Sequence, residues 1–183
     1  MLNTKVSGKT LGLIGFGRIA RALARRAHHG FCMRILFNDP QPPPAAVAQA
    51  LAAESLASLE EVLARADFVS LHCPGGAATR HLINAERLAL MRPGAHLINT
   101  ARGDVVDSVA LTDALDSGHL AGAGLDVYAG EPAVPESLLA LENVVLLPHL
   151  GSATSETRLA MGMRVIENLE AFFAGRGPRD RVV

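Results

Sequence analysis

The chain has 183 residues, of which 49% are hydrophobic and only 4% aromatic, so one globular domain with a core of Ala, Leu, Val and Ile is expected. A formal net charge of -1 argues against a nucleic-acid partner, because such proteins usually carry a strongly basic face. No stretch approaches the roughly 20 apolar residues of a membrane span, and residues 1–9 lack the apolar centre of a signal peptide. Cys32 and Cys73 alone make no disulfide framework, and the cytoplasm is the expected compartment.

The first half of the chain alternates short apolar runs with segments of helical period. Strands are predicted over residues 10–14, 33–37 and 67–71, and helices over residues 18–29 and 59–65. Ser58 and Glu61 fit a capping box at the start of the second of these helices. The run from Pro42 to Pro44 is expected to forbid regular structure after the second strand.

The second half repeats the same rhythm. Further strands are predicted over residues 95–99, 121–127 and 144–147, and helices over residues 85–91, 108–117 and 155–173. Residues 131–136, with two prolines, are expected to form a loop. The alternation predicts an α/β fold: a Rossmann-type, doubly wound, mainly parallel sheet with helices on both faces. No internal linker divides the chain, so a single domain is expected over residues 1–183.

A glycine-rich loop stands between the first predicted strand and the first predicted helix. Its pattern is Gly15-x-Gly17-x-x-Ala20, and this context is typical of a dinucleotide-binding loop. Gly15 permits the tight turn, Gly17 lets the backbone approach the pyrophosphate, and Ala20 allows the helix to pack closely. Arg18 and Ile19 open the helix, whose free N–H groups and partial positive charge favour phosphates. The plainer alternative is an ordinary glycine-rich turn.

Asp39 follows the second predicted strand, close to the expected distance of about 20 residues beyond the loop. A carboxylate there accepts hydrogen bonds from the ribose hydroxyls and would repel a 2′-phosphate. No Arg follows it nearby, so NAD (NADH) is the expected cofactor and NADP is disfavoured. The alternative is a turn-forming Asp in front of Pro40.

Five motifs carry a resemblance to a known family. They are Gly8 to Ile19, then His72-Cys73-Pro74, Asn99-Thr100-Ala101-Arg102-Gly103, Gly124 to Tyr128 with Glu131-Pro132, and Leu147 to Thr154. Their order and spacing resemble the NAD-binding domain of D-isomer-specific 2-hydroxyacid dehydrogenases, from about Gly8 to the end of the chain. Within this family the chain looks most like glyoxylate/hydroxypyruvate reductases, with the phosphoglycerate dehydrogenase branch as the competitor.

The resemblance implies an oxidoreductase that interconverts a D-2-hydroxy acid and a 2-oxo acid by hydride transfer. Arg102 would bind the substrate carboxylate, because a planar guanidinium can do so bidentately. His149 would be the general acid/base, since imidazole titrates near neutrality, and Glu131 would orient it and favour its protonated form. Taken alone, the three have plainer interpretations: a strand-end surface residue, a loop histidine and an exposed loop acid.

The resemblance also implies a set of cofactor contacts. Asp126, at a strand end, is expected to face the nicotinamide. His72-Cys73-Pro74 ends a strand at the carboxyl edge of the sheet, where such folds bind ligands. Thr79, Thr100, Ala101 and Gly151 complete the predicted cofactor set. Cys73 is not expected to be a nucleophile, because hydride transfer needs none, and no metal site is expected.

The resemblance implies enzymes of two domains, and we expect this chain to lack the largely N-terminal substrate-binding domain. Two hypotheses follow: a 2-hydroxyacid dehydrogenase or its cofactor-binding half, favoured by Arg102, Glu131 and His149, or a non-catalytic NAD-binding module, favoured by the missing domain. The small-molecule partner is a 2-oxo or 2-hydroxy acid in the first case. The resemblance further implies a homodimer.

Overall fold

The computed structural model describes residues 4–181. They fall into two compact units, one ending at Pro148 and the other beginning at His149. The first unit contains every strand found in the described residues, and the second contains the long helix α7 (Ser155–Phe173). The expectation of a single domain over residues 1–183 stays a prediction.

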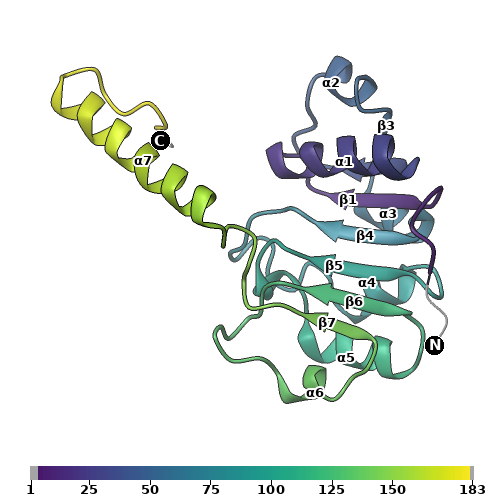
Figure 1. The fold of residues 1–183 in the computed structure, drawn as a ribbon. Helices are drawn as coiled ribbons and strands as arrows, with labels where there is room; N and C mark the ends of the chain where they lie inside the picture. The colour runs from purple at the N-terminus through teal and green to yellow at the C-terminus, as the bar shows by residue number, and fades with distance from the viewer. Residues whose placement is uncertain (1–3, 182–183) are drawn as a thin grey trace. The chain divides into compact units, whose positions relative to one another are not determined.

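The first unit is built on one parallel sheet. Its strands are β1 (Thr10–Ile14), β2 (Arg34–Asn38), β3 (Ala53–Ser55), β4 (Phe68–Leu71), β5 (His96–Asn99), β6 (Gly122–Leu125) and β7 (Val144–Leu146). They pair in the order β3-β2-β1-β4-β5-β6-β7, and all the pairs are parallel (Figure 1). From β1 the chain adds β2 and β3 on one side of the sheet and then β4 to β7 on the other side. This change of side between β1 and β4 creates the crevice where such folds bind ligands. The prediction of a doubly wound α/β fold is confirmed.

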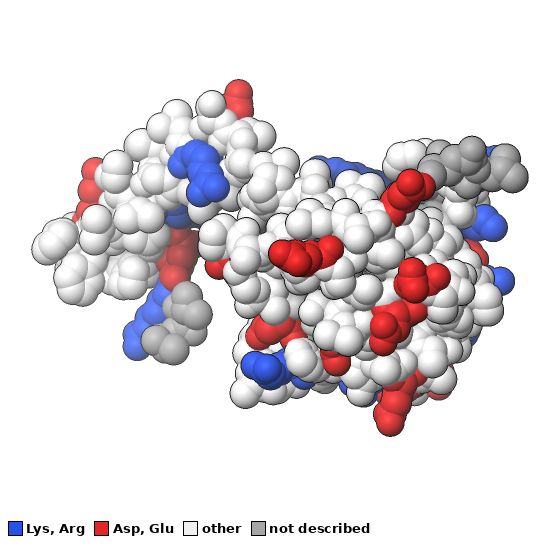
Figure 2. Space-filling model, turned by 90° about the horizontal axis from the view of Figure 1, so that it is seen from below, with Lys and Arg blue, Asp and Glu red and all other residues white. Residues whose placement is uncertain are grey.

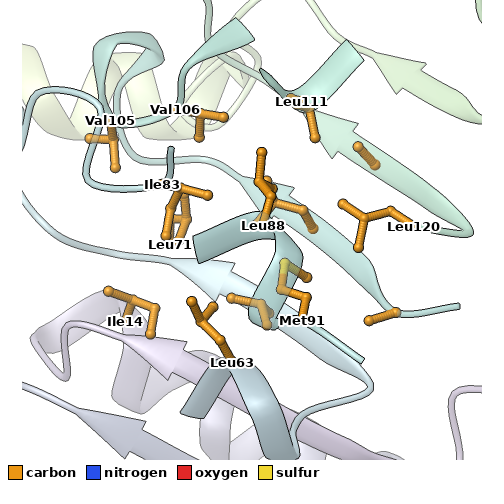
Figure 3. Close-up of a cluster of buried hydrophobic side chains, with 14 of the residues drawn as sticks. Ile14, Leu63, Leu71, Ile83, Leu88, Met91, Val105, Val106, Leu111 and Leu120 are labelled. Carbon is orange, nitrogen blue, oxygen red and sulfur yellow. The ribbon is translucent and has the colours of Figure 1, made fainter. Parts of the chain in front are cut away.

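Helices cover both faces of this sheet. They are α1 (Arg18–Phe31), α2 (Ala45–Gln49), α3 (Leu59–Arg65), α4 (Ala85–Leu90), α5 (Ser108–Asp116) and α6 (Glu136–Leu139), with a 3-10 turn η1 at Gly103–Val105. One apolar cluster joins α1 to β1 and β2 through residues such as Ala24, Leu13 and Ile35. A larger cluster joins α3, α4 and α5 to the other face, and Figure 3 shows Leu63, Leu88 and Leu111 of these helices within it.

The alternation of side chains along β1 explains why both faces are covered. Leu11 and Leu13 belong to the cluster under α1, whereas Ile14 belongs to the cluster under α3. Gly12 lies on the α3 side, where an added Cβ would come within 2.5 Å of Val62 Cγ1. A strand buried on both faces must be apolar at nearly every position, which is why the run from residue 10 to residue 14 lacks a polar face.

Helix starts follow the predicted capping residues. The side chains of Ser58, Asn84 and Asp107 accept hydrogen bonds from backbone N–H groups in the first turns of α3, α4 and α5. Residues 42–44 have no regular structure, as the prolines predict, but α2 and β3 follow them and were not predicted. These two elements have five and three residues, and no residue of α2 is buried, so they leave no apolar period to detect. The strand expected over residues 121–127 is shorter and ends at Leu125.

The second unit consists of a short entry segment, α7 and the chain that folds back along it. Thr154 caps α7 by accepting a hydrogen bond from the Thr157 N–H at 3.2 Å. Asp180 lies beside this helix, because its carboxylate is 3.0 Å from Arg164 Nε and its N–H donates to Asn168 Oδ1. Among the helices of residues 4–181, none combines the length and the apolar character needed to cross a membrane.

Candidate cofactor and active site

A cavity of about 740 Å³ opens at the carboxyl edge of the sheet in the first unit. Its lining residues come from three segments that follow β1, β4 and β5: Ile19, then His72, Cys73, Pro74, Gly75 and Gly76, then Thr100, Ala101, Arg102 and Asp104. Three segments far apart in the sequence meet here because parallel strands end at the same edge. The cavity therefore contains seven of the predicted cofactor and substrate residues.

The glycine loop forms the first wall, and its two glycines have different physical reasons. Gly15 has φ +86°, and a Cβ there would lie 2.9 Å from the backbone C and O of His72, so it is required by packing as well as by conformation. A Cβ at Gly17 would meet nothing within 4 Å. Gly17 is therefore not needed for packing inside the chain, and its open side is the space that a close-lying pyrophosphate would use.

Helix α1 begins at Arg18, directly after Gly17. No side chain caps its N-terminus, and its first turn contains no acidic residue, so the terminal N–H groups are not used by a protein carboxylate. The exposed Ile19, 72% accessible, stands in this turn and lines the cavity. A large apolar side chain in this position offers a flat contact to a ring system, whereas the N–H groups offer a site to an anion.

Asp39 is tied directly to the glycine loop. Its Oδ2 accepts a hydrogen bond from the Phe16 N–H at 2.6 Å, and its Oδ1 accepts one from the Gln41 N–H at 2.8 Å. Each carboxylate oxygen can accept a second hydrogen bond, so the group can still receive ribose hydroxyls. The two interpretations of Asp39 are therefore compatible: it shapes the turn before Pro40 and it presents a negative charge beside the loop.

The segment after β4 forms the second wall. Burial lowers the pKa of His72 to about 4, and its Nε2 lies 3.0 Å from Ser70 Oγ, so the ring is neutral at pH 7. Burial raises the pKa of the Cys73 thiol, and the negative charge of Asp104 raises it further, which disfavours the nucleophilic thiolate. Thr79 does not line the cavity, because its hydroxyl donates to Pro74 O at 2.6 Å and braces the loop.

The segment after β5 forms the third wall and presents Arg102. The buried side chain of Asn99 holds the turn: its Nδ2 donates to Arg102 O at 2.9 Å, and its Oδ1 accepts from the Ala101 N–H at 3.0 Å. Arg102 is exposed, and its Nη1 donates to Ala101 O at 2.6 Å. The remaining guanidinium N–H groups can face a ligand in the cavity.

A fourth strand end, that of β6, carries Asp126 and leads to Glu131. Asp126 is 6% exposed and follows β6 directly. Glu131 accepts a hydrogen bond from the Tyr128 N–H at 3.0 Å, and the Tyr128 hydroxyl donates to Leu125 O and to Leu147 O at 3.1 and 2.9 Å. These bonds fix the loop that carries Glu131 against the end of β6. Neither acid is among the residues lining the cavity.

His149 and Gly151 belong to the second unit. His149 is exposed and has φ +57°, an uncommon backbone conformation for a residue with a side chain. Their predicted roles as acid/base and cofactor contact stay predictions, as does the pairing of His149 with Glu131.

Four residues that position the site had no predicted role: Asn99, Gly103, Asp104 and Gly75. A Cβ at Gly103 would overlap the backbone of Tyr128 and Ala129, so this glycine sets how closely the Arg102 turn can approach the segment after β6. Asn99 and Gly103 belong to one of the motifs identified in the sequence. The motif alone does not show whether such a residue contacts a ligand or only supports the backbone. Asp104 and Gly75 carry no signal in one sequence, since each acts through contacts 27 or more residues away in the chain.

The donor set fits a dinucleotide. The open side of Gly17, the uncapped N-terminus of α1 and the free acceptor capacity of Asp39 match a pyrophosphate and a ribose, and Ile19 supplies an apolar surface. Comparison with known proteins agrees with this. Residues 1–151 match the family model described as D-isomer specific 2-hydroxyacid dehydrogenase, NAD binding domain.

Relatives and solved structures agree with the family model. The chain is 51% identical to a glyoxylate reductase of Thermococcus onnurineus (strain NA1) over 177 residues, 97% of this chain and 52% of that protein. A glyoxylate reductase structure from Paecilomyes thermophila matches with a TM-score of 0.94 and 39% identity over 100% of this chain and 54% of that chain. An NADPH-dependent glyoxylate/hydroxypyruvate reductase structure from Sinorhizobium meliloti matches with a TM-score of 0.88 and 39% identity, over 96% of this chain and 54% of that chain.

The fold, the glycine loop and the cavity at the switch point define a Rossmann-type nucleotide-binding domain. The chain belongs to the D-isomer specific 2-hydroxyacid dehydrogenase family and carries the NAD-binding domain of that family. It spans about half the length of the relatives it matches. The predicted family and the predicted NAD-binding fold are confirmed, and relatives named glyoxylate reductase agree with the predicted subfamily.

Proposed function

We propose that this chain is the NAD(H)-binding half of an oxidoreductase that interconverts a D-2-hydroxy acid and a small 2-oxo acid such as glyoxylate or hydroxypyruvate. One observation carries the proposal: the glycine-loop helix start and Arg102 open into the same cavity, so a dinucleotide site and a carboxylate-binding cation are neighbours. The names of the relatives supply the substrate class.

NADH, when bound, would supply a hydride to the carbonyl carbon of the substrate. Arg102 would bind the substrate carboxylate through the guanidinium N–H groups that Ala101 O does not use, and Asn99 holds its backbone in place. His149 would donate a proton to the carbonyl oxygen as it becomes the hydroxyl, and would accept that proton in the reverse direction. Glu131 would stabilise the protonated imidazole.

The cofactor preference is proposed to be NAD(H) over NADP(H), and Asp39 carries it. Its carboxylate is held at the loop by the Phe16 N–H and the Gln41 N–H, so it cannot easily turn away from a 2′-phosphate. Side-by-side fluorescence titrations with NADH and NADPH test this. Tighter binding of NADPH than of NADH would contradict it.

The activity is tested by following NADH absorbance while the purified chain is mixed with glyoxylate, hydroxypyruvate, pyruvate or phenylpyruvate. Oxidation that His149→Ala abolishes and that His29→Ala, at an exposed position on α1, leaves intact would support catalysis by this chain with His149 as the acid. Activity that survives His149→Ala would remove His149 as the acid. NADH binding without any oxidation would favour the alternative, a module that binds NAD(H) without catalysis, which the half-length match to relatives also permits.

We further propose that the chain forms a homodimer and works in the cytoplasm. Ala171 is the one buried residue of α7, while Leu159, Val165, Phe172 and Phe173 of this helix are 60–80% exposed, which favours a partner surface. Both cysteines are free, in agreement with a reducing compartment. Sedimentation that gives a monomer at micromolar concentration would contradict the dimer.

A further inference from the structure

The cavity that holds Arg102 also holds a carboxylate that the proposed mechanism does not use. Arg102 and Asp104 are the charged side chains among the lining residues, because the pKa of His72 is lowered to about 4 and its ring is neutral at pH 7. The cavity therefore presents one fixed positive and one fixed negative charge, two residues apart in the chain.

Gly75 brings the two charges to the same place. A Cβ at this glycine would lie 2.8 Å from Arg102 Cγ and 3.0 Å from Asp104 Oδ1, so both side chains pack against its backbone. They are held separately: Asp104 Oδ2 accepts from the Gly76 N–H at 3.3 Å, and Arg102 Nη1 donates to Ala101 O at 2.6 Å. The carboxylate is thus fixed to the β4 wall of the cavity and leaves guanidinium N–H groups of Arg102 available.

We propose that Asp104 determines the charge of the substrates that this site accepts. This inference rests on the proposed function, in which Arg102 binds the carboxylate of a 2-oxo acid. A second anionic group on the same substrate would stand beside the Asp104 carboxylate, and like charges repel strongly in a partly enclosed site. The site therefore takes 2-oxo acids with one carboxylate and an uncharged remainder, and it rejects 2-oxo dicarboxylates and phosphorylated 2-oxo acids.

Pyruvate and oxaloacetate test this, because they differ by one carboxylate. NAD⁺ carries no hydride for a 2-oxo acid, so with NAD⁺ as the cofactor neither compound can be reduced and calorimetry measures both affinities. We expect wild type to prefer pyruvate, and Asp104→Asn to shift the ratio of the two affinities toward oxaloacetate by roughly 10-fold. Asp104→Glu keeps the charge and should keep the wild-type ratio. Higher salt should reduce the wild-type preference, because it screens the repulsion.

Asp116→Asn is the matched control, since it removes the same charge at an exposed position at the end of α5. It should leave the ratio unchanged. A ratio that Asp104→Asn does not move would overturn the inference and leave the proposed function intact. Pyruvate that fails to bind the wild-type chain while NADH binds would instead remove Arg102 as the carboxylate site, and this inference with it.

Discussion

The glycine loop and the Arg102 turn face the same cavity but are built in opposite ways. The glycine loop depends on the lack of a side chain at two positions. At Gly15 this lets the backbone of His72 approach, and at Gly17 it leaves open space. The Arg102 turn works through side chains that are braced, chiefly the buried amide of Asn99 with its two backbone partners. One wall thus offers backbone N–H groups to phosphates, whereas the other holds a cation and an anion in fixed positions.

Because of this difference, substitutions in the two walls should have different effects on stability and on cofactor binding. A wall made of backbone tolerates a new side chain only where the space is open, whereas a braced turn depends on hydrogen bonds that a substitution can leave unpaired. The stability of the chain should therefore be most sensitive at the Arg102 turn. Dinucleotide affinity should be sensitive at Gly17 with no loss of stability.

The largest effect is expected for Gly103→Ala at the Arg102 turn. The new Cβ would overlap the backbone of Tyr128 and Ala129, and backbone atoms cannot rotate away as a side chain can. We expect a loss of about 4 kcal/mol in the free energy of unfolding, or no soluble protein. Gly30→Ala, whose Cβ meets nothing within 4 Å near the end of α1, is the control and should not destabilise. A melting temperature of Gly103→Ala close to wild type would contradict the packing argument.

Asn99→Ala should come next. It removes the donor to Arg102 O and leaves the buried Ala101 N–H without its acceptor. The expected loss is about 3 kcal/mol, measured by urea unfolding. Asn143→Ala, which removes a single 3.3 Å bond to Leu115 O, should cost about 1 kcal/mol. Equal losses in the two variants would show that Asn99 does not hold the turn.

The contrast between the walls also explains what could be predicted from the sequence. The strands, the longer helices and the glycine loop follow from local patterns: apolar runs, capping residues and a glycine spacing. Asp39 was predicted as a ribose contact, but its bond to the Phe16 N–H joins residues 23 apart in the chain and depends on how β2 lies beside β1. The same holds for Asp104, whose partners Gly75 and Gly76 follow a different strand.

Residues in a predicted motif were easier to find than to interpret. The cofactor contact predicted for Thr79 stays a prediction: its hydroxyl donates to Pro74 O, and Thr79 is not among the residues that line the cavity. Asn99 stands in a motif but acts as a brace. A sequence motif indicates that a residue matters for the site. Whether its side chain contacts a ligand or the backbone depends on the direction of that side chain, which the motif does not give.

The backbone of His72 packs beside Gly15 of the glycine loop, and titration of the buried His72 ring should appear in the stability of the chain. Its pKa of about 4 lies below the ordinary value of 6.5, so the unfolded chain binds the proton more tightly than the folded one. The stability it contributes is present above pH 6.5 and is lost as the pH falls toward 4. Between pH 7 and pH 5 we expect His72→Asn to remove about 2 kcal/mol of the pH dependence, measured by urea unfolding at both values. An equally steep dependence in this variant would assign it to other groups, such as His96, whose pKa burial also lowers.

Gly17→Ala should separate binding from stability. Gly17 has φ -71°, which alanine adopts freely, and its Cβ would meet nothing within 4 Å, so the free energy of unfolding should change by less than about 0.5 kcal/mol. The same Cβ would stand where a pyrophosphate must approach the N-terminus of α1, and the NADH dissociation constant should rise at least roughly 10-fold.

Gly15→Ala is the counterpart: with φ +86° and a Cβ 2.9 Å from the backbone of His72, it should lower stability by about 2 kcal/mol or more. NADH fluorescence titration and thermal unfolding of both variants test the contrast. If Gly17→Ala bound NADH as wild type does, the open side of Gly17 would not be the pyrophosphate site, and the dinucleotide would have to lie elsewhere along the edge.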